Sequence, residues 1–147
     1  MVLVYDIKHG EVDMHLIVYG NGSAEDIMRM VGSVVPKENI EVCGDIQCLS
    51  ARLRKPFEGE SVVVLLLPAD RDDLQAIMTI QYLLENVRAV VVAPNQEAET
   101  ISMAHMLRPR FLTYAGEDLR TLTSVLYKMT SGRNSDGMQE RRSLPRG

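Results

Sequence analysis

The 147-residue sequence has no tryptophan, two phenylalanines and two cysteines. Two cysteines are too few to cross-link a small secreted domain, so we expect a cytoplasmic protein in a reducing compartment. The chain contains no apolar run of the roughly 18 residues that span a membrane, and no leader of signal-peptide type opens it. Its net charge of -4 lacks the positive excess of a nucleic-acid-binding surface. We therefore expect neither nucleic acid nor a membrane as its partner.

The hydrophobic fraction of 46% and the length suit one globular domain with a substantial core. Short apolar runs rich in β-branched residues predict buried strands. Two of these runs are continuously apolar, as expected of parallel strands that helices cover on both faces. The predicted strands are His15–Gly20, Asn39–Cys43, Ser61–Leu67, Ala89–Ala93 and Phe111–Tyr114.

Segments with helical spacing of apolar residues lie between these strands and after the last one. Strict alternation of strand and helix predicts a parallel sheet with right-handed crossovers, in an α/β three-layer sandwich. The predicted helices are Ala24–Val35, Ile46–Arg54, Asp72–Leu84, Glu97–Leu107 and Asp118–Met129.

Two segments lie outside the five strand–helix units. Residues 1–13 contain a strand-like run, Val2–Tyr5, and a turn, whereas residues 131–147 are polar and resemble a tail or linker. The domain itself is expected at residues 14–130. An exposed sheet edge invites cover, so we predict that Val2–Tyr5 lies beside the second strand of its own chain or of a partner.

A glycine-rich turn follows the first predicted strand, where α/β sheets often bind anions. The turn matches neither the dinucleotide-binding motif nor the P-loop. Two interpretations stay open: a tight turn with a helix cap, and a flavodoxin-like site for flavin or another small ligand. The residues concerned are Gly20, Asn21, Gly22 and Ser23.

Three acidic residues, Asp70, Asp72 and Asp73, follow the third predicted strand. Such a cluster suits either a helix start or a hard cation, and we favour the helix start because no carboxylate ends the first strand. Cys43 and Cys48 have neither redox nor zinc spacing, so we expect buried free thiols. No hydrolase or metalloprotease motif occurs, and we expect no enzyme activity, no cofactor and no metal.

The segment Phe111–Ala115 (FLTYA) resembles the end of the fifth strand in receiver domains of bacterial two-component signalling. Receivers place an aromatic, an aliphatic and a variable residue there, followed by Lys-Pro. The resemblance covers roughly residues 14–130. It implies a flavodoxin-like (βα)5 fold with strand order 2-1-3-4-5, to which Val2–Tyr5 would add an extra N-terminal strand.

The resemblance also implies that this sequence has other residues at the positions where a receiver binds Mg²⁺ and accepts the phosphoryl group. The resemblance places the acidic pair at Tyr19 and Gly20, or at Gly20 and Asn21. The phospho-accepting aspartate falls on Leu67 or Pro68. The hydroxyl residue becomes Ala93 and the lysine becomes Tyr114. The resemblance therefore implies a pseudo-receiver, which acts by binding proteins without being phosphorylated.

The surface that receivers use for output predicts where a partner would bind. It comprises the fourth helix, the fifth strand and the fifth helix, and we expect a protein partner and a homodimer through it. Phe111 is either the receiver's switch aromatic or a core-edge residue. The candidate interaction residues are Met103, Met106, Phe111, Tyr114 and Tyr127.

Overall fold

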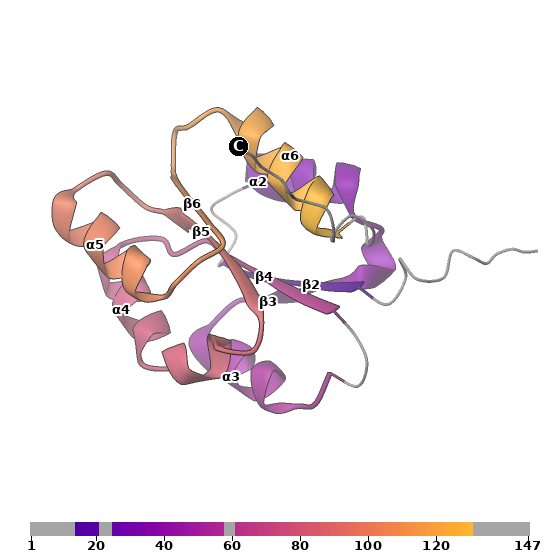
Figure 1. The fold of residues 1–147 in the computed structure, drawn as a ribbon, viewed down its shortest axis with the longest axis horizontal. Coiled ribbons are helices and arrows are strands. Elements are labelled where there is room, and N and C mark those ends of the chain that lie inside the picture. Colours follow the sequence, from indigo (N-terminus) through magenta and orange to yellow (C-terminus); the bar gives the residue numbers. More distant parts are fainter. Residues whose placement is uncertain (1–13, 21–24, 58–60, 131–147) are drawn as a thin grey trace, which may run out of the picture.

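The computed structural model describes residues 14–20, 25–57 and 61–130. One parallel sheet runs through this part of the chain, with strand order β3-β2-β4-β5-β6 (Figure 1). Counted along the described chain this order is 2-1-3-4-5, so the flavodoxin-like prediction is confirmed. The strands are β2 (Met14–Tyr19), β3 (Ile40–Cys43), β4 (Ser61–Leu66), β5 (Arg88–Ala93) and β6 (Phe111–Tyr114).

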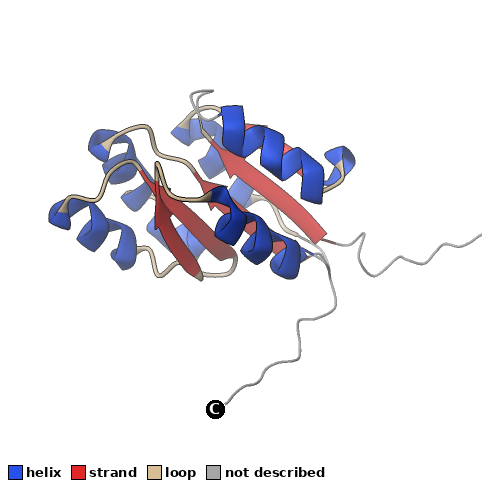
Figure 2. Cartoon of the chain, turned by 90° about the horizontal axis from the view of Figure 1, so that it is seen from above, coloured by secondary structure: helices blue, strands red, loops and turns tan. Residues whose placement is uncertain are grey.

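Helices cover both faces of the sheet, which makes the predicted three-layer sandwich (Figure 2). One layer consists of α2 and α6, and the opposite layer of α3, α4 and α5. The helices are α2 (Glu25–Val34), α3 (Ile46–Arg54), α4 (Arg71–Met78), α5 (Ala98–Met106) and α6 (Leu119–Thr130), with short 3-10 turns η1 (Lys37–Asn39) and η2 (Gln81–Leu84).

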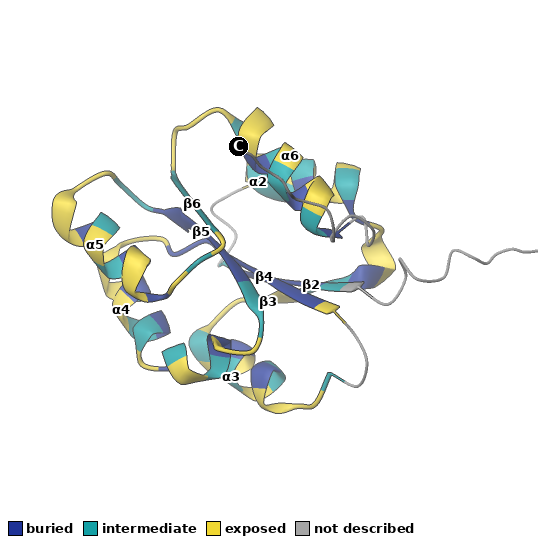
Figure 3. Cartoon of the chain, in the orientation of Figure 1, coloured by how far each residue is buried: buried dark blue, intermediate teal, exposed yellow. Residues whose placement is uncertain are grey.

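The sheet divides the core into two apolar clusters. Successive side chains of β2 point to opposite faces, so Ile17 packs towards α3 and α4 while Leu16 packs towards α2 and α6. In β4 every residue from Val62 to Leu66 is buried (Figure 3). This double burial explains why the central strands have continuous rather than alternating apolar sequences.

The third predicted helix, Asp72–Leu84, is interrupted in the structure. Helix α4 ends at Met78, and η2 begins at Gln81. The Thr79 hydroxyl donates to the carbonyl of Ala76 at 2.6 Å, and the backbone of Ile80 leaves the helical region. Ile80 and Leu84 are nonetheless buried, so apolar spacing continues through a break that periodicity alone does not reveal. The other described boundaries differ from prediction by one residue at most.

Three of the sequence-based predictions lie outside the described residues. These concern the strand Val2–Tyr5, the loop positions Asn21, Gly22 and Ser23, and the tail at residues 131–147. Among the described helices, none combines the length and apolar character that a bilayer span requires.

A charged cluster joins β2, β3 and α3. Glu41 Oε2 lies 2.8 Å from His15 Nε2, and Arg52 Nε donates to Glu41 Oε1 at 2.6 Å. The hydrogen bond from Arg52 is the main cause that holds the pKa of Glu41 below its ordinary value of 4.5. The ionised carboxylate therefore stabilises the packing of α3 against the edge strand.

Stability is expected to depend on the charge of Glu41. Because its pKa is lowered on folding, its contribution is fully present above a pH of about 4.5 and is lost as the pH falls through the folded value. Glu41→Gln should therefore lose less stability than the wild type between about pH 6 and about pH 3. Urea denaturation at both pH values measures this loss, with the exposed Glu38→Gln as control. Identical losses in all three proteins would contradict the prediction.

Candidate functional site

The carboxyl ends of the strands form the edge at which α/β sheets place their chemistry. At this edge the structure brings Tyr19, Gly20 and Leu67 together. The Leu67 amide donates to the carbonyl of Tyr19 at 2.9 Å, and the Gly20 amide donates to that of Cys43 at 3.1 Å. A Cβ atom built on Gly20 would lie only 3.3 Å from Leu67 Cβ. The backbone of β2 therefore continues into close contact with the end of β4.

The two positions to which the receiver resemblance assigns the phospho-accepting aspartate, Leu67 and Pro68, are apolar and buried. Leu67 is only 7% exposed and belongs to the core cluster under α2 and α6, and Pro68 is buried as well. Neither side chain has an oxygen that could attack phosphorus. The end of β4 thus acts as part of the core.

Ala93 and Tyr114 lie side by side in the pairing of β5 with β6. Ala93 is fully buried, and its carbonyl accepts a hydrogen bond from the Ala115 amide at 2.8 Å. The hydroxyl of Tyr114 bonds Glu117, and this bond raises the pKa of Tyr114. Ala93 has no hydroxyl group and Tyr114 has no cation, although the receiver resemblance puts a hydroxyl residue and a lysine at these two positions.

A buried tyrosine ends β2, at one of the positions where the receiver resemblance puts the acidic pair. Tyr19 is 4% exposed, and its hydroxyl donates to Asp73 Oδ1 in the first turn of α4. Burial, followed by the nearby Asp73 carboxylate, raises the pKa of Tyr19 well above its ordinary value. The phenol is therefore neutral and remains a donor at physiological pH.

The acidic residues that follow β4 serve the start of α4, as the sequence predicted. Asp70 caps the helix by accepting from the Asp73 amide at 2.8 Å. The second oxygen of Asp73 accepts from the Ala69 amide at 2.9 Å. Within the described ranges no three His, Cys, Asp or Glu side chains gather closely enough to hold a metal ion.

The two cysteines differ in their environment. Cys43 is buried at the end of β3, where burial and the neighbouring Cys48 thiol raise its pKa to about 12. Cys48 is exposed in the first turn of α3, so the prediction of two buried thiols is wrong for this residue. The reason is the direction of α3, which turns Leu49 and Leu53 inward and leaves Cys48 on the solvent side.

The predicted interaction residues lie on two faces of the molecule. Met103 packs against the cluster under α3, α4 and α5, and Met106 is exposed on the same helix. Phe111 packs against the opposite cluster, and Tyr127 is exposed on α6 in that opposite layer. Tyr114 lies at the carboxyl edge between them. The structure therefore groups Met103 with Met106 and separates both from Tyr127.

Two solved structures from Burkholderia share this architecture. A putative pilus assembly-related protein from Burkholderia pseudomallei has a TM-score of 0.57 at 16% identity, over 89% of this chain and 96% of that chain. A putative pilus assembly protein (cpaE) from Burkholderia thailandensis has a TM-score of 0.56 at 16% identity, over 80% and 98% of the two chains. Together with the strand order, this likeness decides the fold. The chain has a flavodoxin-like (βα)5 fold.

A CheY-like response regulator receiver domain protein from Methanospirillum hungatei superposes with a TM-score of 0.48 at 15% identity, over 80% of this chain and 97% of that chain. No protein-family model matches the sequence, and no curated protein matches it significantly. Likeness to solved structures at identities this low shows the fold alone.

Proposed function

We propose that this receiver-like domain is a pseudo-receiver, a protein-interaction module that works without phosphorylation and without enzymatic activity. The observation that carries the proposal is the hydrogen bond from Tyr19 to Asp73. It places a neutral phenol where the receiver resemblance puts a metal-binding carboxylate, and it engages the nearest carboxylate with a donor.

The chemistry of phosphorylation supports the same proposal. Phosphoryl transfer to a carboxylate requires a cation to neutralise developing charge, a nucleophile, and contacts that hold the product. Leu67 offers no nucleophile and Ala93 no hydroxyl, and both are buried. The residues at this edge therefore contribute to the core. In this proposal the partner binds to the exposed surfaces of the helices. One Burkholderia protein is described as a putative pilus assembly-related protein and the other as a putative pilus assembly protein, and docking within an assembly is the kind of role proposed here.

Exposure to a phosphodonor tests the proposal directly. We expect that acetyl phosphate or fluoroberyllate, added with Mg²⁺, leaves the amide resonances of Leu67, Ala93 and Tyr114 unshifted. The reason is that β2 ends in Tyr19 and Gly20, without a carboxylate, and that Leu67 and Pro68 after β4 offer no acceptor oxygen. A receiver that is competent for phosphorylation serves as positive control under the same conditions. Saturable shifts at these three amides would overturn the proposal.

A further inference from the structure

The fold brings the two cysteines of the chain into contact, although their spacing in the sequence matches neither a redox nor a zinc motif. Cys43 is the last residue of β3, and Cys48 is the third residue of α3. Their thiols share a side-chain hydrogen bond. The contact is made by the turn from strand to helix, which the spacing of the two residues does not reveal.

The backbone of this turn holds the two side chains together. The Asp45 side chain caps α3 by accepting from the Cys48 amide at 2.7 Å, and the Asp45 carbonyl accepts from the Leu49 amide at 3.1 Å. Side chains in an α-helix tilt towards its N-terminus, so that of Cys48 leans back towards the end of β3. Cys43 belongs to the core cluster that α3 covers, together with Leu49. Both thiols therefore lie between the end of β3 and the first turn of α3.

The two thiols differ in what can reach them. Cys43 is 2% exposed, and burial, followed by the Cys48 thiol, raises the pKa of Cys43 to about 12, so this thiol is protonated at neutral pH. Cys48 is exposed, so a reagent in the solvent reaches Cys48 first. An accessible thiol that contacts a second thiol is the arrangement in which oxidation ends in a disulfide rather than in a higher oxide of sulfur.

We propose that Cys48 and Cys43 form a peroxide-sensitive dithiol site, in which a hydroperoxide oxidises Cys48 and Cys43 then closes a disulfide with it. In the first step the Cys48 sulfur attacks the O–O bond and becomes a sulfenic acid, while the other oxygen leaves as an alcohol or, from hydrogen peroxide, as water. In the second step the Cys43 sulfur attacks the sulfur of the sulfenic acid, and the departing hydroxide takes the Cys43 proton to form water. The two thiols lose two electrons in total, and the O–O bond accepts them.

The disulfide joins the end of the edge strand β3 to the first turn of α3. A disulfide needs its two Cβ atoms only about 4 Å apart, so thiols that are already in contact can form it with little movement of the backbone. Exchange with an external dithiol reverses it. This site goes beyond the proposed function, because it requires neither a partner nor the positions that correspond to the phosphorylation residues of a receiver.

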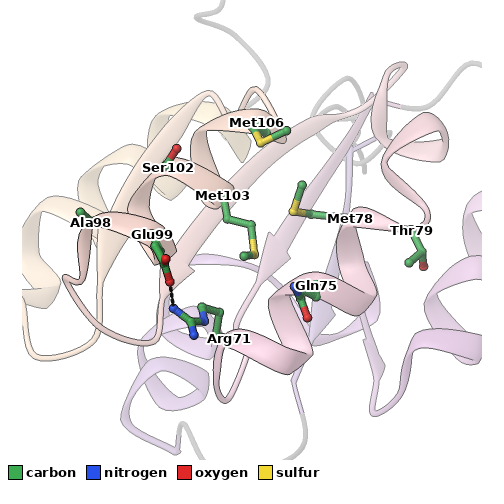
Figure 4. Close-up of a pocket in the computed structure, with 9 residues that line it drawn as sticks. All are labelled: Arg71, Gln75, Met78, Thr79, Ala98, Glu99, Ser102, Met103 and Met106. Atoms are coloured by element: carbon green, nitrogen blue, oxygen red, sulfur yellow. Dashed lines mark hydrogen bonds and ion pairs between the residues drawn. The ribbon is translucent and has the colours of Figure 1, made fainter.

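The methionines of the chain provide a second, separate target for peroxide. Met78, Met103 and Met106 line an open groove of about 910 Å³ between α4 and α5 (Figure 4), and Met106 is 54% exposed. Neither cysteine lines this groove. The two reactions are distinguished by mass, because a disulfide removes about 2 Da and a methionine sulfoxide adds about 16 Da.

Mass spectrometry after treatment with hydrogen peroxide tests the site. The wild type should form one disulfide within each chain, which peptide mapping assigns to Cys43 and Cys48 and which dithiothreitol reverses. With dimedone present, which traps sulfenic acids, Cys43→Ala should carry one adduct on Cys48, because the sulfenic acid then has no thiol beside it. Cys48→Ala is the matched variant, and it should lose its remaining thiol at least about tenfold more slowly than the wild type, because buried thiols are inert.

Three results would overturn the proposal. These are a wild type that keeps both thiols while Met106 is oxidised, disulfides that form only between chains, and a Cys48→Ala variant that loses its thiol as fast as the wild type. Circular dichroism establishes that both variants are folded, and the result for the wild type depends on neither of them. None of these outcomes bears on the phosphodonor test, so the two proposals can fail separately.

Discussion

The Leu67→Asp variant is expected to lose about 3–5 kcal/mol of unfolding free energy at neutral pH, because it buries a carboxylate without a partner. Leu67 is 7% exposed and lies in the core cluster with Val18, Leu65 and Val92. In a phosphorylatable receiver an aspartate at this position would be held by neighbouring cations, and here it would face apolar side chains. Urea denaturation at equilibrium measures the loss.

The Leu67→Asn variant separates charge from polarity. It has a similar size and no charge, so its loss should be smaller, about 1–3 kcal/mol. Burial raises the pKa of this carboxyl group in the folded variant, so its destabilising effect should decrease as the pH falls. Below about pH 4 the group is neutral in the folded and the unfolded states, and the stabilities of the two variants should converge. If the Leu67→Asp variant were as stable as the wild type, or if it bound Mg²⁺, the end of β4 would not be part of the apolar core.

Removal of the Tyr19 hydroxyl is expected to lower the unfolding free energy by about 2 kcal/mol, the range for a buried hydrogen bond to a charged group. In Tyr19→Phe the ring still fills its place in the core, but one oxygen of Asp73 loses its donor. Tyr127→Phe is the control, because its side chain is 59% exposed, and its change should stay within about 0.5 kcal/mol.

A double-mutant cycle isolates the contact between β2 and α4. The variants Tyr19→Phe, Asp73→Ala and their combination should show a coupling energy of about 1–2 kcal/mol, because the two side chains share one hydrogen bond. Additive losses would mean that Tyr19 contributes through packing alone. In that case the hydrogen bond would no longer support the proposed function.

Local patterns predicted most of the fold correctly. The limits of α3 at Ile46–Arg54 and of β6 at Phe111–Tyr114 agree with the sequence prediction. Both segments have clear periods, and their ends are marked by local chemistry such as the Asp45 cap, which accepts from the Cys48 amide at 2.7 Å. The break after α4 escaped prediction because Ile80 and Leu84 continue the apolar spacing while the backbone changes course.

The candidate site was predicted as a set of positions but not as a set of contacts. The receiver resemblance placed Tyr19, Leu67, Ala93 and Tyr114 at one edge of the sheet. In the structure Tyr19 lies beside Leu67, and Ala93 lies beside Tyr114. The bond between Tyr19 and Asp73 joins residues 54 positions apart. The one signal for it in the sequence is that a buried tyrosine hydroxyl requires a partner, and this rule does not say which carboxylate supplies the bond.

The sequence by itself determined that the chain forms a parallel α/β sandwich. The spacing of apolar residues and the residues that form turns act over a few positions, so they can be recognised in short segments of the sequence. Through the resemblance, it also predicted the positions at which the phosphorylation residues of a receiver are replaced. Only the tertiary structure decided that Tyr19 bonds Asp73, that Cys48 faces solvent, and that Met103 and Met106 share a groove on the side opposite Tyr127. These outcomes depend on how each helix packs against the sheet. A rotation of the helix about its axis by one residue position changes which side chain is buried, and the spacing of apolar residues does not fix that rotation.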